Sequence, residues 1–154
     1  MTYAYTDGST FHGNPAPISW AIIFVRDGEI LEELTGAFNQ GNNNRAELMA
    51  VICALEYERF TDFMIVSDSQ LTVHICNGKW VPQKNLDLWT RFDQALADRE
   101  RRGLFTDFVH IRGHRTPTMK DWSPEHSPFN TRADVLAKEA GERAHGHLVL
   151  PTET

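Results

Sequence analysis

Cysteine is scarce in this sequence, and long apolar runs are missing from it. Only two cysteines occur among 154 residues, Cys53 and Cys76, and they lack the paired spacing of a zinc site or a disulfide framework. No stretch approaches the roughly 20 apolar residues that a membrane span needs. The chain begins with a strand-like segment, residues 1–5, rather than with a charged and then apolar leader. These absences predict a soluble, cytoplasmic protein with reduced thiols and no membrane partner.

Basic charge is also in short supply. Fifteen Lys and Arg residues accompany 21 Asp and Glu residues, which gives a formal net charge of −6. This total argues weakly against nucleic-acid binding, which normally needs a basic surface. The acid excess lies in residues 1–70, with ten acids and three bases, whereas residues 71–154 have eleven and twelve. Such an excess can simply keep a surface soluble, but a site for divalent cations also needs uncompensated carboxylates.

The length fits one domain with a buried core, and the apolar pattern predicts the element order β-β-β-α-β-α-α-β-α. We expect strands at residues 2–6, 18–25, 29–38, 63–66 and 105–111, and helices at residues 45–60, 70–76, 86–102 and 131–144. Three strands joined by hairpins, followed by strands separated by helices, predict an α/β fold. Its sheet is mixed, with three antiparallel strands then two parallel ones, and has helices on both faces. The domain would cover residues 1–145, and residues 146–154 would form a flexible tail.

Loop and cap signals complete this outline. Asparagines at 42–44 are expected to cap the first long helix, and Asn130 the last one. Residues 115–129 contain three prolines and no periodicity, which predicts a long exposed loop.

Four carboxylates are predicted at the ends of these elements. Asp7 and Asp68 each follow an apolar strand, and adjacent parallel strands would bring them within a few Å. Glu47 and Asp134 are expected in the first turns of their helices, where an acid can simply interact with the helix dipole. Turn or cap chemistry explains each acid alone, but it does not explain why this topology gathers all four. Two divalent cations roughly 3.5–4 Å apart need such oxygen ligands and can promote phosphodiester hydrolysis.

Five short motifs contain these acids or lie between them. They are Tyr5-Thr6-Asp7-Gly8-Ser9, Asn43-Asn44-Arg45-Ala46-Glu47-Leu48, Ser67-Asp68-Ser69-Gln70, Gly113-His114 and Asn130-Thr131-Arg132-Ala133-Asp134. In this order they resemble the signature of the type 1 ribonuclease H family, and they extend over residues 3 to about 140, nearly the whole chain.

The resemblance implies an endonuclease that hydrolyses the RNA strand of RNA–DNA hybrids and leaves 5′-phosphate and 3′-hydroxyl ends. It implies two Mg²⁺ ions, with Mn²⁺ as a substitute, held by Asp7, Glu47, Asp68 and Asp134, and no organic cofactor. His114 would assist proton movement or product release. His126, in the long loop, is the alternative for that role. We expect a monomer.

The resemblance also implies contacts with the hybrid. Groups around Gly8, Ser9, Glu47 and Gln70 would read ribose 2′-hydroxyls. The minor groove would be contacted by Asn14, Asn43, Asn44 and Gln70. Asn42 and Asn85 would form a pocket for a DNA phosphate, although the family usually has a hydroxyl residue in place of Asn42.

One feature of the best-studied bacterial relatives is absent here, a basic helical protrusion before the second long helix. Only Lys79, Trp80 and Lys84 occupy that space, so the sequence resembles family members that lack the protrusion. Trp80 and Trp89 could stack on the DNA strand, although the helical spacing of Trp89 suits a core position equally well. Arg99, Arg101 and Arg102 form a cluster that we interpret as complementing a helix C-terminus rather than contacting the hybrid.

Two other functions are compatible with parts of this pattern. One is a transposase- or resolvase-like nuclease of the same fold that acts on DNA, against which the 2′-hydroxyl-reading motifs argue. The other is a non-catalytic hybrid-binding module, against which the presence of all four carboxylates argues.

Overall fold

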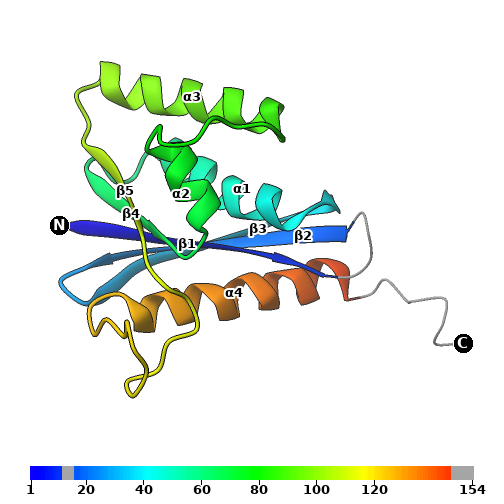
Figure 1. The fold of residues 1–154 in the computed structure, drawn as a ribbon, viewed down its shortest axis with the longest axis vertical. Coiled ribbons are helices and arrows are strands. Elements are labelled where there is room, and N and C mark those ends of the chain that lie inside the picture. The colour runs from blue at the N-terminus through cyan, green and yellow to red at the C-terminus, as the bar shows by residue number, and fades with distance from the viewer. Residues whose placement is uncertain (12–15, 147–154) are drawn as a thin grey trace, which may run out of the picture.

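The computed structural model describes residues 1–11 and 16–146, and in them a five-stranded sheet has helices on both faces (Figure 1). The strands are β1 (Thr2–Thr10), β2 (Ala16–Arg26), β3 (Glu29–Gly41), β4 (Phe63–Ser67) and β5 (Thr106–His110). Their order across the sheet is β3-β2-β1-β4-β5. The first three strands pair antiparallel, whereas β4 pairs parallel with β1 and β5. The predicted mixed sheet is confirmed.

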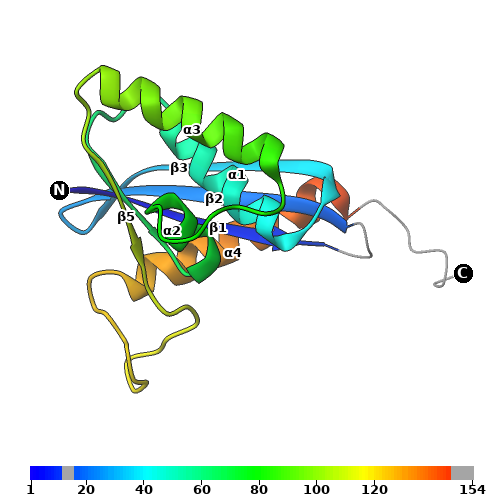
Figure 2. The ribbon, with the colours of Figure 1, turned by 45° about the horizontal axis from the view of Figure 1, so that its top comes forward.

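The helices divide unequally between the two faces of the sheet (Figure 2). On one side lie α1 (Asn43–Glu56), α2 (Gln70–Cys76) and α3 (Leu86–Arg101), and on the other lies α4 (Ser127–His145). Across the described ranges, no helix combines the length and the apolar character that crossing a membrane would require. Nearly all of the predicted tail, residues 147–154, lies outside the described residues.

Each face of the sheet contributes to its own apolar core, because successive strand residues point to opposite faces. Ala4 and Ile65 belong to the cluster under α1, whereas Tyr5 and Val66 pack with Leu136 of α4. Both faces of β4 are therefore buried, as its continuous apolar run predicts.

Strand β1 is longer than predicted, so Asp7 does not end it. β2 is long enough to pair with β1 as far as Thr10, which lies opposite Ile18. The parallel pairing with β4 stops earlier, at Thr6 and Ser67. Asp7 thus lies one residue beyond the end of the β1–β4 pairing. The prediction that Asp7 ends its strand therefore holds for the pairing with β4 and is wrong for the pairing with β2.

Helix α1 begins at Asn43, two residues before the predicted start. The side chain of Asn42 caps it by accepting a hydrogen bond from the Arg45 backbone N–H at 2.9 Å. Glu47 therefore lies beyond the first turn, and the prediction that it interacts with the helix dipole from the first turn is wrong. The helix ends at Glu56 rather than Phe60, whose ring stacks on Phe24 with centroids 4.4 Å apart.

Helix α4 begins four residues earlier than predicted, at Ser127. Pro128 fits the first turn, where its missing N–H costs nothing. The Ser127 N–H donates to the Ser123 carbonyl at 2.8 Å, and the Ser127 hydroxyl accepts from the Ser123 N–H at 2.9 Å. Asn130 is therefore inside the helix rather than its cap, and Asp134 lies beyond the first turn. The predicted loop over residues 115–129 therefore ends earlier than expected, because its last three residues belong to α4.

Trp89 and Arg99, two residues of α3 that the sequence analysis considered for contacts with the hybrid, are buried. Trp89 is a core residue, in contact distance of Phe92 with ring centroids 5.1 Å apart. Arg99 is only 2% exposed; its guanidinium lies 4.2 Å from the centre of the Phe63 ring, and its Nε donates to Thr106 Oγ1 at 2.7 Å. Arg99 lies in the last turn of α3, as the predicted complement to the helix C-terminus requires, but its side chain is buried. Arg101 and Arg102 are at the surface and pair with Asp98.

Candidate active site

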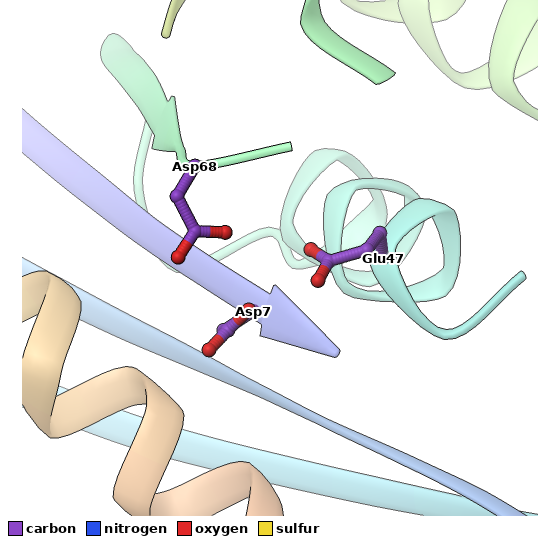
Figure 3. Close-up of side chains that lie close together, drawn as sticks. All are labelled: Asp7, Glu47 and Asp68. Atoms are coloured by element: carbon purple, nitrogen blue, oxygen red, sulfur yellow. The ribbon is translucent and has the colours of Figure 1, made fainter. Parts of the chain in front are cut away.

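Three carboxylates from different elements meet beside β1 (Figure 3). Asp7 comes from β1, Glu47 from α1, and Asp68 follows the last residue of β4. One oxygen from each lies within 4.8 Å of the others. The structure therefore brings together three of the four predicted carboxylates.

Two glycines allow this close approach. A Cβ atom on Gly8 would collide with the backbone of Ala46 and Glu47, so a larger residue would push α1 away from β1. A Cβ atom on Gly113 would collide with the Asp68 carboxylate. Both glycines thus define where the acidic side chains lie.

Two of the three carboxylates are buried, the third is half-buried, and the triad lacks compensating charge. Asp7 is 3% exposed and Glu47 is 6% exposed, and no ion pair in the described part of the chain involves either of them or Asp68. Burial raises the pKa of Asp7, and the nearby charges of Glu47 and Asp68 raise it further. Burial also raises the pKa of Glu47, with Asp68 contributing in the same direction. Within the described residues, Glu47 Oε2 is buried without a hydrogen-bond partner. These are properties of a cation site, because hard divalent cations bind carboxylate oxygens.

The fourth predicted carboxylate faces the same hollow from the other side of the sheet. This hollow encloses about 410 Å³ and is lined by Asp7, Gly8, Ser9, Thr10, Asn43, Glu47, Asp68, Gly113, His114, Asp134 and Lys138. Asp134 is not part of the close triad, and its Oδ2 lies 3.1 Å from Lys138 Nζ.

The two candidate histidines lie in different places. His114 lines the hollow and has a left-handed backbone conformation, with φ 54°. His126 instead has its Nδ1 atom 2.7 Å from the Tyr5 hydroxyl, on the face of the sheet that α4 covers. The geometry thus favours His114 over His126 for a role at the carboxylates.

The predicted hybrid contacts fall into two groups. Gly8, Ser9 and Asn43 line the carboxylate hollow. Asn44, Trp80 and Asn85 line a second hollow of about 410 Å³ between α2 and α3, with Leu71, Thr72, Val81, Gln83, Lys84 and Trp89. Gln70 is exposed at the start of α2, and Asn14 lies outside the described residues.

Arg45 connects the two asparagines of the predicted phosphate pocket. Its backbone N–H is capped by Asn42, and its Nη1 donates to Asn85 Oδ1 at 3.3 Å. The guanidinium also forms two hydrogen bonds of 2.9 Å with Asp87, which raise the pKa of Arg45. An arginine that is already paired with a carboxylate therefore lies at the place where the sequence predicts a phosphate.

Three residues near the site were missed as functional candidates. Arg45 and Asn130 occur in the quoted motifs, but sequence reasoning gave the first no role and the second only a cap. Asn130 Nδ2 in fact donates to Asp68 Oδ2 at 3.3 Å. Lys138 was detectable, since it lies four residues after Asp134 on the same helix.

The segment between α2 and α3 agrees with the absence of a basic protrusion. Residues 77–85, all of them described, contain no helix. Trp80 is 46% exposed there and packs edge-on against His74.

Comparison with known proteins places this fold and site in a family. The sequence profile of RNase H matches residues 1–142. The chain belongs to the RNase H family. It is accordingly an enzyme of the nuclease class, and the resemblance that the five motifs indicate is confirmed.

Relatives of known name agree with this assignment. The chain is 40% identical over 149 residues to a Ribonuclease H of Afipia carboxidovorans, with 88% of this chain and 89% of that protein covered. It is 35% identical over 150 residues to a Ribonuclease H of Nitrosococcus oceani, covering 88% and 90%.

Solved RNase H1 structures share the fold. LC11-RNase H1, solved in complex with an RNA/DNA hybrid, superposes with a TM-score of 0.73 at 25% identity, covering 94% of this chain and 99% of that one. RNase H1 from Halobacterium salinarum gives a TM-score of 0.68 at 30% identity, covering 92% and 98%. The RNase H fold that the resemblance implies is confirmed.

Proposed function

We propose that this RNase H chain is an endonuclease that hydrolyses the RNA strand of RNA–DNA hybrids at the hollow around Asp7, Glu47, Asp68 and Asp134. The observation that carries the proposal is the triad of uncompensated carboxylates, two of them buried and one half-buried, in a polar hollow of the surface. The hybrid-bound structure of LC11-RNase H1 supports the substrate class.

The donor set fits divalent cations. Asp7, Glu47 and Asp68 offer oxygens within 4.8 Å of one another, and Asp134 offers a fourth carboxylate across the hollow. When bound by these groups, two Mg²⁺ ions, or Mn²⁺ in their place, would neutralise phosphate charge and supply hydroxide near neutral pH. Asp134 Oδ2 is paired with Lys138 Nζ at 3.1 Å, so Asp134 would have to exchange this ion pair for a cation to serve as a ligand. The products would carry 5′-phosphate and 3′-hydroxyl ends.

Recognition of the hybrid would use both hollows. Gly8, Ser9 and Asn43 lie beside the carboxylates, where they can meet ribose 2′-hydroxyls, and exposed Asn44 and Gln70 extend this surface. On the DNA side, Trp80 offers a ring for stacking. Asn42 and Asn85, joined through Arg45, would hold a DNA phosphate.

We include in the proposal a single catalytic domain over residues 1–145 that acts as a cytoplasmic monomer. Size-exclusion chromatography with light scattering at the concentration of the cleavage assay would detect a dimer.

The substrate proposal is tested with one sequence in four forms: hybrid, RNA duplex, DNA duplex and single-stranded RNA. We expect Mg²⁺- or Mn²⁺-dependent cutting of the RNA strand of the hybrid alone, with 5′-phosphate ends and no cutting in chelator. Cutting of the DNA duplex would instead favour a transposase- or resolvase-like nuclease. Hybrid binding without cutting would favour a non-catalytic module.

His114→Ala should slow cleavage without abolishing it. A proton-transferring side chain contributes roughly a hundredfold or more to a rate, whereas the carboxylates remain in place. Single-turnover and multiple-turnover rates on the hybrid would separate proton transfer, which lowers both, from product release, which lowers only the second. An unchanged rate in both assays would remove His114 from the proposed site.

A further inference from the structure

Helix α4 carries two groups of the carboxylate site on successive turns. Asn130 donates to Asp68 Oδ2 at 3.3 Å, and Asp134 lines the hollow one turn later. The position of α4 along the sheet therefore decides where both groups lie.

The surface that α4 presents to the sheet consists largely of small residues. Ala133, Ala137, Ala140 and Gly141 are buried there, which lets the helix approach closely but offers few large side chains to fix it lengthwise. At its C-terminal end polar contacts do this instead. The Ser19 hydroxyl donates to the Ala137 carbonyl at 2.6 Å, and His145 Nε2 lies 3.1 Å from the Ile18 carbonyl oxygen.

A polar contact of the same kind holds the N-terminal end. The Tyr5 hydroxyl is hydrogen-bonded to His126 Nδ1 at 2.7 Å and donates to the Glu125 carbonyl at 3.3 Å. The His126 ring packs edge-on against Tyr3, with centroids 4.9 Å apart. Tyr5 is 1% exposed and precedes Asp7 by two residues on the same face of β1. The Tyr5 hydroxyl thus links the strand of Asp7 to the start of the helix of Asn130 and Asp134 through two hydrogen bonds.

This link also closes the long connection between β5 and α4. The connection leaves β5 beside Asp68, where Gly113 and His114 line the hollow, and returns at His126. It is far longer than the roughly 4–6 residues that usually join two elements. A connection of this length can reach many positions along the sheet, so it does not by itself determine where α4 begins.

We propose that Tyr5 and His126 form a positioning pair that sets the lengthwise position of α4, and through it the place of Asn130 and Asp134 at the cation site. The inference rests on the proposed function for its catalytic consequence. Neither residue touches substrate or metal; both act through α4.

The test uses Tyr5→Phe and His126→Ala, which each remove the hydrogen bond between Tyr5 and His126. It also uses His126→Asn, whose side-chain amide can form a hydrogen bond with the Tyr5 hydroxyl in place of Nδ1. Tyr57→Phe is the matched control, because it removes a tyrosine hydrogen bond to Glu32 on the opposite face of the sheet. Mn²⁺ affinity is measured by electron paramagnetic resonance without substrate, and hydrogen exchange is measured over residues 123–134. Hybrid cleavage gives kcat and KM, and thermal unfolding gives Tm.

We expect Tyr5→Phe and His126→Ala to weaken Mn²⁺ binding roughly tenfold, because a shift of α4 would take Asn130 away from Asp68, and losing an outer-shell partner of a metal ligand usually has an effect of this size. Exchange in the first turns of α4 should accelerate, and kcat should fall while KM stays unchanged. His126→Asn should restore Mn²⁺ affinity, and Tyr57→Phe should lower only Tm.

Unchanged Mn²⁺ affinity and exchange in both variants, with a lower Tm, would overturn the inference and leave the pair a merely structural contact. If the wild-type protein fails to cut the hybrid while Mn²⁺ affinity and exchange still respond, the proposed function fails and the positioning pair stands.

Discussion

Asp68→Asn is expected to abolish metal-dependent cleavage of the hybrid while leaving the fold intact. The substitution keeps the shape of the side chain and an oxygen for Asn130, but it removes a charge from the triad. We expect a loss of at least roughly a thousandfold, because bound cations supply several kcal/mol of transition-state stabilisation and each 1.36 kcal/mol is worth tenfold. The measurement is the single-turnover rate in saturating Mg²⁺.

The matched control for this loss is Asp93→Asn, which neutralises an exposed carboxylate of α3. It should cut at the wild-type rate. Hybrid affinity, measured by fluorescence anisotropy in chelator, should be similar or slightly tighter for Asp68→Asn, because a negative charge near the phosphates is gone. Cleavage by Asp68→Asn at the wild-type rate would show that the triad does not hold the reactive cations.

Asp7→Asn is expected to raise the stability of the metal-free protein. Asp7 is buried between Glu47 and Asp68, so its charged form is disfavoured in the folded state and its pKa is raised. The amide removes this repulsion and can still accept the hydrogen bond that Gly8 N–H donates to Oδ1 at 3.0 Å. Tm in chelator at pH 8 should rise by several degrees, because each 1 kcal/mol shifts Tm by about 2–4 °C in a domain of this size.

The sign of the pH dependence follows from the same raised pKa values. Between the unfolded pKa of about 4 and the folded pKa, the folded state binds more protons than the unfolded state, so stability falls as pH rises. The metal-free wild type should therefore lose stability from pH 5.5 to pH 8 through Asp7 and Glu47, and Asp7→Asn should lose less. Mg²⁺ should stabilise the wild type at pH 8 but not the variant. If Asp7→Asn is less stable than the wild type in chelator at pH 8, the triad is not repulsive.

The sheet and three carboxylates could be predicted because their signals are local. The hairpin turns between the first strands and the apolar run before Asp68 predict a mixed sheet. This prediction does not depend on the residue at which each strand ends. Asp7 was placed at a strand end because a turn-like sequence follows it. Its strand continues because β2 is long enough to pair with it, which is a tertiary cause.

The start of α4 was misplaced for a similar reason. Three prolines predict a loop, but Pro128 occupies a first turn, where proline is tolerated. The error hid the contact of Asn130 with Asp68, which no sequence pattern reports. Arg99, in contrast, was detectable, since it lies seven residues after Phe92 on the buried face of α3.

The most direct test of the central claim, a two-cation site built from these carboxylates, is the number of Mn²⁺ ions that the protein binds with its substrate. Mn²⁺ would be titrated calorimetrically into the protein bound to a hybrid that keeps its 2′-hydroxyls but has a methylene group in place of the 3′-oxygen of each RNA linkage, so that the RNA resists cleavage. The same titration would be made with the complex of Asp68→Asn. We expect two Mn²⁺ ions per chain for the wild type and weaker, substoichiometric binding for the variant. A single ion in the wild-type complex, or equal binding by Asp68→Asn, would contradict the account.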